Sequence, residues 1–222
     1  MPETVITVQG SYDAFLPAER ATVTVAVGFE GPEQGPVVAR TTQGTAALVA
    51  GIVDRHDPER GPVTWWASDR IRVWSRRPFN DKGDQRPLVH HALTSTRAKF
   101  RDFEELARWV QRAATHPGVR VDGIEWALTE ATKAAAVGDV RTRAVEEART
   151  KASAYAAALG LTELRCVAVA DPGMLGDQVH GGGDGPVAYS RAAGGGEAPG
   201  GLVLTPEDIA VSATVDARFI AS

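Results

Sequence analysis

The chain of 222 residues contains a single cysteine, Cys166, so it cannot form a disulfide within itself. Cys166 lies in the apolar run Leu164–Ala170, where we expect it to be a small buried hydrophobic residue. A nucleophilic or redox-active cysteine requires partial exposure and a positioned histidine or cation. Neither is visible in the sequence around Cys166, so we expect no thiol chemistry.

Long hydrophobic runs are also missing. No segment approaches the roughly 20 apolar residues that cross a bilayer, so we expect no membrane span. The first residues carry no basic patch followed by an apolar stretch, so we expect no signal peptide. Instead, a strand-like pattern begins at Thr4. If Met1 is the natural start, these absences predict a cytoplasmic protein.

An excess of charge of one sign is lacking as well. The 24 Lys and Arg residues stand against 28 Asp and Glu residues, which gives a net charge of -4. A slightly acidic chain has no electrostatic footprint for nucleic acid, so we expect no nucleic-acid partner. Hydrophobic residues make up 43% and charged residues 23%, which is ordinary for a globular protein. This length allows one domain over residues 1–222, with two small lobes as the alternative.

Motifs for catalysis, cofactors and metals are lacking too. Gly181–Gly185 is not followed by the Gly-Lys-Ser/Thr of a phosphate-binding loop, and it is one copy rather than a tandem calcium-binding repeat. His90 and His91 are adjacent, so in a strand they point to opposite faces and cannot easily share a metal. No serine lies in a Gly-x-Ser-x-Gly elbow. We therefore expect no catalytic, cofactor-binding or metal-ligating residues, no enzyme activity and no cofactor.

Two strongly alternating segments are present near the ends of the chain. Apolar residues occupy the odd positions of Arg20–Glu30 and again the odd positions of Ile209–Ile220. Alternation of this length is typical of antiparallel strands with one face on a core. We also expect Thr4–Gly10 to form an N-terminal hairpin with Arg20–Glu30 through a loop that contains Pro17.

Helical and strand patterns alternate between these ends. We expect one helix that ends near Asp54 and a second that begins with the capping box Asp102–Glu105. We also expect long strands at Val63–Arg76 and Leu88–Phe100, and a strand at Val119–Leu128 with a bulge around Gly123. The Gly-, Ala- and Pro-rich segment 176–201 is expected to be the most mobile or protease-sensitive internal segment.

The segment Arg143–Gly160 has the most informative pattern, because its apolar positions recur every three or four residues. Most of them are alanine, which allows a helix to lie close to a sheet; the stripe consists of Val140, Ala144, Ala148, Ala152, Tyr155, Ala156 and Leu159. Glu147 and Lys151 lie one turn apart in the favourable order. The element order predicts an α+β fold, with a mainly antiparallel sheet packed against this long Ala-rich helix, Val140–Leu159, and two shorter helices.

This helix resembles the long helix of the SIMPL-domain proteins, a bacterial family that contains periplasmic immunogenic proteins and stress-linked relatives. Ile6–Gly10, Ala21–Val27, Val121–Thr129 and Ile209–Phe219 are similar to strands of that family in the same order, so the resemblance covers nearly the whole chain. Many relatives are exported or lipid-anchored, and the absence of a signal peptide departs from them.

The resemblance implies a function in binding rather than catalysis. The family has no established catalytic residues, and several relatives form ring-like oligomers. We therefore expect a non-enzymatic, stress-linked protein that acts as a homo-oligomer or by binding a protein partner. The alternative is a small-molecule-binding protein or an enzyme with its site under the segment 176–201.

The segment Val63–Arg76 combines tryptophan and arginine on one predicted face. If it is one strand, its odd positions (Trp65, Ala67, Asp69, Ile71 and Val73) form a core face. Its even positions then place two indoles among three guanidinium groups, which are side chains enriched in protein interfaces. We predict an interface of Trp66, Arg70, Arg72, Trp74 and Arg76. Two alternatives stay open: arginine stems that cover half-buried rings, and a site for an anionic or sugar ligand.

Overall fold

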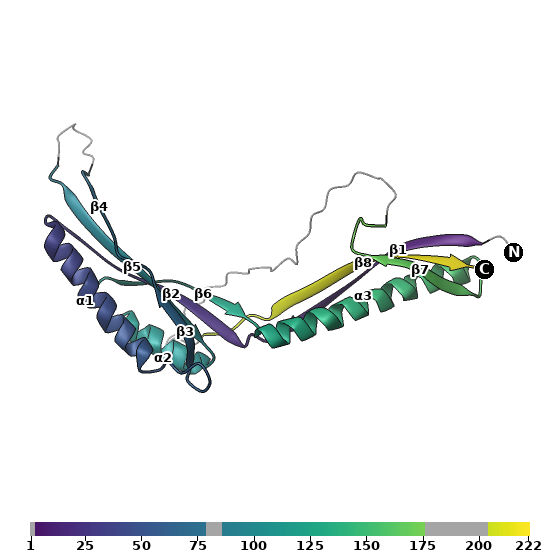
Figure 1. The fold of residues 1–222 in the computed structure, drawn as a ribbon, viewed down its shortest axis with the longest axis horizontal. Coiled ribbons are helices and arrows are strands. Elements are labelled where there is room, and N and C mark those ends of the chain that lie inside the picture. The colour runs from purple at the N-terminus through teal and green to yellow at the C-terminus, as the bar shows by residue number, and fades with distance from the viewer. Residues whose placement is uncertain (1–2, 79–85, 176–203) are drawn as a thin grey trace. The chain divides into compact units, whose positions relative to one another are not determined.

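The computed structural model describes residues 3–78, 86–175 and 204–222 (Figure 1). They form two compact units, the first of residues 3–17, 128–175 and 207–222, and the second of residues 18–78, 86–127 and 204–206. The described residues contain three helices and two antiparallel sheets, so the predicted α+β fold is confirmed. The segment 176–201, with the mobility expected of it, lies outside the described residues.

The first unit is a three-stranded sheet with one long helix along one face (Figure 1). The strands lie in the order β1 (Thr4–Leu16), β8 (Ile209–Ala221) and β7 (Leu164–Ala170), all antiparallel. The helix α3 (Glu130–Ala158) packs mainly on β1 and β8. The alternation predicted for residues 209–220 is confirmed, because the residues facing α3 from β8 include buried Val211, Val215, Ala217 and Phe219.

The contact between α3 and β1 is unusually close. The buried residues of α3 are Val140, Ala144, Ala148, Ala152 and Ala156. A Cβ atom added to Gly10 of β1 would lie only 2.1 Å from the Ala144 carbonyl oxygen and 2.6 Å from the Ala148 nitrogen. The helix backbone therefore lies directly against the strand, and the prediction that alanine permits this approach is confirmed.

Three expectations about this unit are wrong. The helix begins at Glu130, well before Val140, since the hydroxyl of the N-cap Thr129 accepts a hydrogen bond from the Thr132 N–H. Tyr155 and Leu159 are 56% and 63% exposed, so they do not belong to the buried stripe. Cys166 is exposed because β7 is an edge strand that α3 barely reaches, and because the strand has a bulge next to Cys166.

The second unit is a five-stranded sheet with two helices on one face (Figure 1). Its strands are β2 (Arg20–Gly31), β3 (Val63–Ser68), β4 (Arg72–Arg76), β5 (Val89–Phe100) and β6 (Val119–Ala127), in the order β3-β5-β2-β6 with β4 also on β5. The helices are α1 (Gln34–Val53) and α2 (Phe103–Ala113). The predicted ends are confirmed: Asp54 is the C-cap of α1, and the Asp102 side chain accepts from the Glu105 N–H at the start of α2.

The core of the second unit lies between this sheet and its helices. Its main members are Ala21, Val23, Val25 and Val27 of β2, Leu48 and Ile52 of α1, and Leu106, Trp109, Val110 and Ala113 of α2. The odd positions of β2 therefore face the helices, as predicted. The expected bulge in β6 is also present, since the partner of β2 moves from Gly123 to Val121 between Thr24 and Val25.

Two expectations about strand pairing are wrong. The N-terminal hairpin does not form, because β1 pairs with β8 while β2 pairs with β5 and β6. Alternation indicates which face of a strand is buried but not which strand lies beside it. The segment 63–76 is two short strands, β3 and β4, that pair in turn with β5 and are separated at residues 69–71.

Glu105 of α2 holds three arginines. Its carboxylate accepts from Arg55 at 2.6 Å, Arg108 at 3.0 Å and Arg112 at 3.1 Å, and the Arg55 hydrogen bond does most to lower the pKa of Glu105. Because the folded pKa is depressed, its contribution to stability is present at neutral pH and is lost as the pH falls through that pKa. Glu105→Gln should reduce the free energy of unfolding at neutral pH. It should also make that free energy fall less as the pH is lowered, as measured by urea unfolding over a pH series.

The close contact at Gly10 gives a second prediction. Gly10→Ala should destabilise the protein by about 1–3 kcal/mol, because the new methyl group meets helix backbone that cannot move aside cheaply. The matched control is Gly138→Ala on the exposed side of α3, where an added Cβ meets nothing within 4 Å. That change should stabilise the helix by about 0.5–1 kcal/mol. Equal effects of the two changes on the free energy of unfolding would contradict this packing.

Candidate functional site

Among the described residues of the second unit, helices pack on only one face of the five-stranded sheet. In β5 the even residues from Ala92 to Phe100 are buried, and they share a face with the helix-covered residues of β2. The odd residues of β5 point the other way, and within this unit the described residues place no helix over them. We call this second side the open face; it carries Glu30, Trp65, Arg72, Trp74, Arg76, His91, Leu93, Arg97, Lys99 and Arg120.

A bulge in β3 exchanges the roles of its two tryptophans. Val63 pairs with Phe100 but Trp65 pairs with Lys99, so the register shifts at Thr64. Trp66 therefore lies on the helix-covered side and packs against the core, whereas Trp65 lies on the open face and is 43% exposed. The prediction that the odd positions form a core face is therefore wrong for β3, because one extra residue reverses the parity of a strand. In β4 the odd position Val73 lies opposite buried Ala92, on the predicted side.

The structure brings together three of the five predicted interface residues. Arg72, Trp74 and Arg76 lie on the open face, opposite odd residues of β5. Arg70 is exposed in the connection between β3 and β4, and Trp66 is on the other side of the sheet. The five predicted interface residues therefore do not share one face. Trp65, rather than Trp66, lies on the open face with the arginines.

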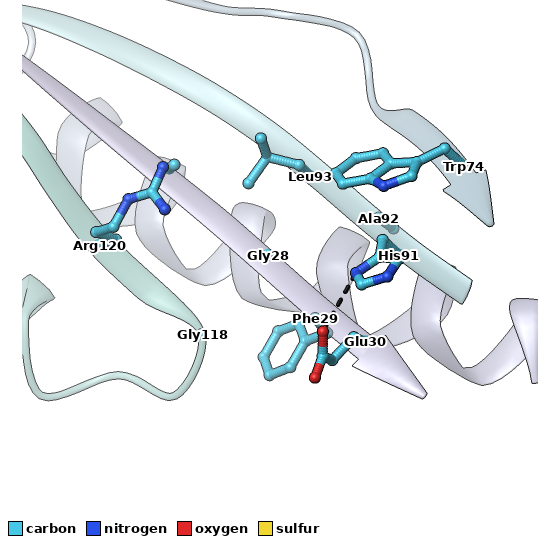
Figure 2. A pocket seen from close by; sticks show the side chains of 10 residues that line it. Gly28, Phe29, Glu30, Trp74, His91, Ala92, Leu93, Gly118 and Arg120 are labelled. Atoms are coloured by element: carbon cyan, nitrogen blue, oxygen red, sulfur yellow. Dashed lines mark ion pairs between the residues drawn. The ribbon is translucent and has the colours of Figure 1, made fainter. Parts of the chain in front are cut away.

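Trp74 rests on a histidine of the neighbouring strand. Its ring is stacked on the His91 ring, with centroids 5.2 Å apart and planes 6° apart. Figure 2 shows the two side chains next to each other. His91 Nδ1 lies 3.2 Å from Glu30 Oε2 on β2, and the histidine side chain is only 13% exposed. Trp74 itself is 45% exposed. One face of the indole therefore contacts a mostly buried histidine that is paired with Glu30. The outer surface of the indole stays available for contact.

A hollow of about 300 Å³ lies beside this stack on the open face. Trp74 and His91 border it on one side and Arg120 of β6 on the other, with Gly28 and Leu93 between them (Figure 2). Because Gly28 has no side chain to project from β2, the surface of the sheet is recessed at this point. The hollow is more open to solvent than enclosed, so it resembles a groove more than a closed ligand pocket.

The arginines around the open face differ in whether a carboxylate pairs with them. Arg120 donates to Asp122 at 2.6 Å, and this hydrogen bond raises the pKa of Arg120. By contrast, no carboxylate among the described residues pairs with Arg72, Arg76 or Arg97. Within residues 3–78, 86–175 and 204–222, the open face therefore combines exposed aromatic surface with positive charge that no carboxylate pairs.

Several residues of this surface were not predicted from the sequence. Arg97 lies with its guanidinium carbon 5.9 Å from the centre of the Trp65 ring, and His91 supports Trp74. The alternation of residues 89–100 contained a signal, because its odd positions include a histidine, an arginine and a lysine. Only the pairing of β5 with β3 and β4 places these cations beside the two indoles.

Other kinds of site are not found in the part of the chain that the structure describes. His90 and His91 point to opposite faces, as predicted, and His90 contacts Ser75 at 2.7 Å. No group of three or more His, Cys, Asp or Glu side chains within residues 3–78, 86–175 and 204–222 is placed to hold a metal ion. No helix formed by those residues is long and apolar enough to cross a membrane.

Comparison with known proteins identifies a family but not a site. A family model described as "SIMPL: Protein of unknown function (DUF541)" matches residues 6–219, which is nearly the whole chain. No curated protein matches the chain. The match therefore assigns no catalytic or binding residue, and the geometry of the open face is the main guide to function.

The different surroundings of Trp66 and Trp74 give a third prediction. Trp66→Ala should lower the free energy of unfolding by about 2–3 kcal/mol, because it removes an indole that packs against the core. Trp74→Ala should change stability by less than about 1 kcal/mol, because it removes only a half-exposed ring. Urea unfolding of the two variants measures both effects, and a larger loss for Trp74→Ala would show that this ring is structural cover.

Proposed function

Since the chain belongs to the SIMPL family, whose function is unknown, we propose that it is a non-enzymatic protein that acts by self-assembly through its open face. The observation that carries this proposal is the pairing of half-exposed Trp65 and Trp74 with arginines that no carboxylate of the described residues compensates. Tryptophan and arginine are the side chains most enriched at the energetic centres of protein interfaces. No described residue bears on a stress-linked role, which stays a prediction.

The distribution of charge supports a second copy of the chain as the partner. The whole chain carries a net charge of -4, although Arg72, Arg76, Arg97 and Lys99 place positive charge together on the open face. The rest of the surface is therefore more acidic than the chain as a whole. A second copy offers complementary acidic surface, and a contact between two different patches generates rings when its rotation closes.

A small-molecule site is the second candidate function. The hollow between Trp74 and Arg120 supports it, because an aromatic wall and a cation are common in sites for planar anions. Its volume of about 300 Å³ lies at the lower limit for such pockets, and Arg120 is already paired with Asp122. The expected site under residues 176–201 lies outside the described residues.

The test is the double change Arg72→Ala with Trp74→Ala. It should weaken self-association by about 2–4 kcal/mol, the range of interface hot spots, and should leave the fold intact. Light scattering and sedimentation over a concentration series measure the mass. Higher salt should weaken the association of the unchanged protein, because exposed charges are screened.

The matched control removes the same kinds of side chain elsewhere. Arg149→Ala with Tyr155→Ala removes an exposed arginine and a 56% exposed aromatic ring from α3 in the first unit. This control should keep the parent mass. A parent protein that is monomeric at micromolar concentration would refute self-assembly. An Arg72/Trp74 variant that keeps both mass and stability would leave the ligand site, to be tested with acidic glycans and nucleotides.

A further inference from the structure

The strand β1 forms one edge of the sheet in the first unit. It pairs with β8 along its whole length, from Thr4 opposite Ala221 to Leu16 opposite Ile209, without a shift in register. Asp13 is its only charged residue, and it contains no proline. Long, regular and nearly uncharged edges are the ones that add a further strand, because their outer N–H and C=O groups are unpaired.

The other sheet edges have features that discourage strand addition. The strand β7 is short, is interrupted by a bulge and carries Arg165. In the second unit, β6 has a bulge and three charged residues among its 9, β3 has only 6 residues and a bulge, and β4 has only 5 residues with an arginine at each end. Short length, bulges and charges are the usual protections of natural edges. The strand β1 is 13 residues long, has no bulge, and carries Asp13 as its single charge.

Two side chains of α3 occupy the middle of the β1 edge instead. Glu147 Oε2 accepts a hydrogen bond from the Ser11 N–H at 3.2 Å, and Lys151 Nζ donates to the Gln9 carbonyl oxygen at 3.0 Å. Glu147 and Lys151 also form an ion pair at 2.9 Å. We call these two residues the edge clip. They satisfy one outward N–H and one outward C=O, which are the groups that a neighbouring strand would otherwise bind.

The clip lies where a second copy of β1 would make its central contacts. Two β1 strands in antiparallel full overlap are related by a two-fold axis at Gly10, and the Ser11 N–H of each then faces the Gln9 carbonyl of the other. The same overlap sets Val5 opposite the partner's Phe15; these residues are 61% and 67% exposed. Self-complementary pairing of this kind forms a closed two-fold dimer.

We propose that the edge clip is an autoinhibitory contact that prevents β1 from pairing with β1 of a second copy of this chain. While the clip is closed, the central hydrogen bonds of that pair are occupied from within. When it is opened, the Ser11 N–H and Gln9 carbonyl become free, and the exposed Val5 and Phe15 add apolar contact between the copies. This surface is separate from the open face and does not depend on the function proposed for it.

The clip can be opened with Glu147→Ala and Lys151→Ala in the full chain that already carries Arg72→Ala and Trp74→Ala. In that background association through the open face is already weakened, so a change in the measured mass reports on pairing through β1. Self-association measured by sedimentation should become at least about tenfold tighter. The matched control is Arg143→Ala with Glu146→Ala, which removes another ion pair of α3, for which the structure records no side-chain hydrogen bond or ion pair to a described residue of β1. The control should not change the association.

A third change tests whether β1 is the surface used. Thr7 is exposed and has the same outward orientation as Gln9 and Ser11, so Thr7→Pro removes an outer N–H without removing a hydrogen bond to β8. Added to the opened clip, it should abolish the gain in association. No gain from opening the clip would overturn the proposal, and so would a gain that Thr7→Pro leaves unchanged.

Hydrogen exchange on the unchanged protein provides a test that needs no variant. The Ser11 amide should exchange more slowly than the outward amides of Thr7 and Asp13, for which the structure records no acceptor among the described residues. If Ser11 exchanges as fast as those two, the clip does not form in solution and the proposal is wrong. This result decides the matter even if the clip variant does not fold.

Discussion

The helices described here cover only one face of each sheet, and this constraint governs both units. A strand alternates its side chains between two faces, so burial of one set leaves the other set without a helix above it. In β5 the buried face reads Ala92, Thr94, Thr96, Ala98 and Phe100, while the other face carries His91, Arg97 and Lys99. The composition of that uncovered face determines which interactions the second unit can make with other molecules.

The close packing of α3 on β1 links the core of the first unit to its edge. With glycine at position 10 and alanine at 144 and 148, the helix backbone comes into contact with the strand. At that distance Glu147 and Lys151 reach over the strand and bind its outer backbone groups. A bulkier stripe would hold the helix farther away and leave the edge uncovered. Small core residues therefore have a consequence for association as well as for stability.

The two candidate contact surfaces rely on different forces. On the open face, Trp74 and Arg72 would contribute through desolvated rings and charge pairs, which depend on side-chain identity and on salt. On the β1 edge, the contribution would come from backbone hydrogen bonds, whose geometry is the same for almost any sequence. Specific recognition therefore fits the open face. The edge fits a surface that has to be kept closed, because backbone pairing discriminates poorly between partners.

The sequence by itself determined the family, the α+β class, the burial parity of residues 20–30 and 209–220, the end of α1 and the start of α2. These features depend on local periodicity and capping, which neighbouring residues specify. Tertiary structure alone decided that β1 pairs with β8, about two hundred residues away in the chain, since alternation carries no information about partners. It also decided that a bulge at Thr64 moves Trp65, rather than Trp66, onto the open face, because one extra residue reverses the side chains of the rest of β3.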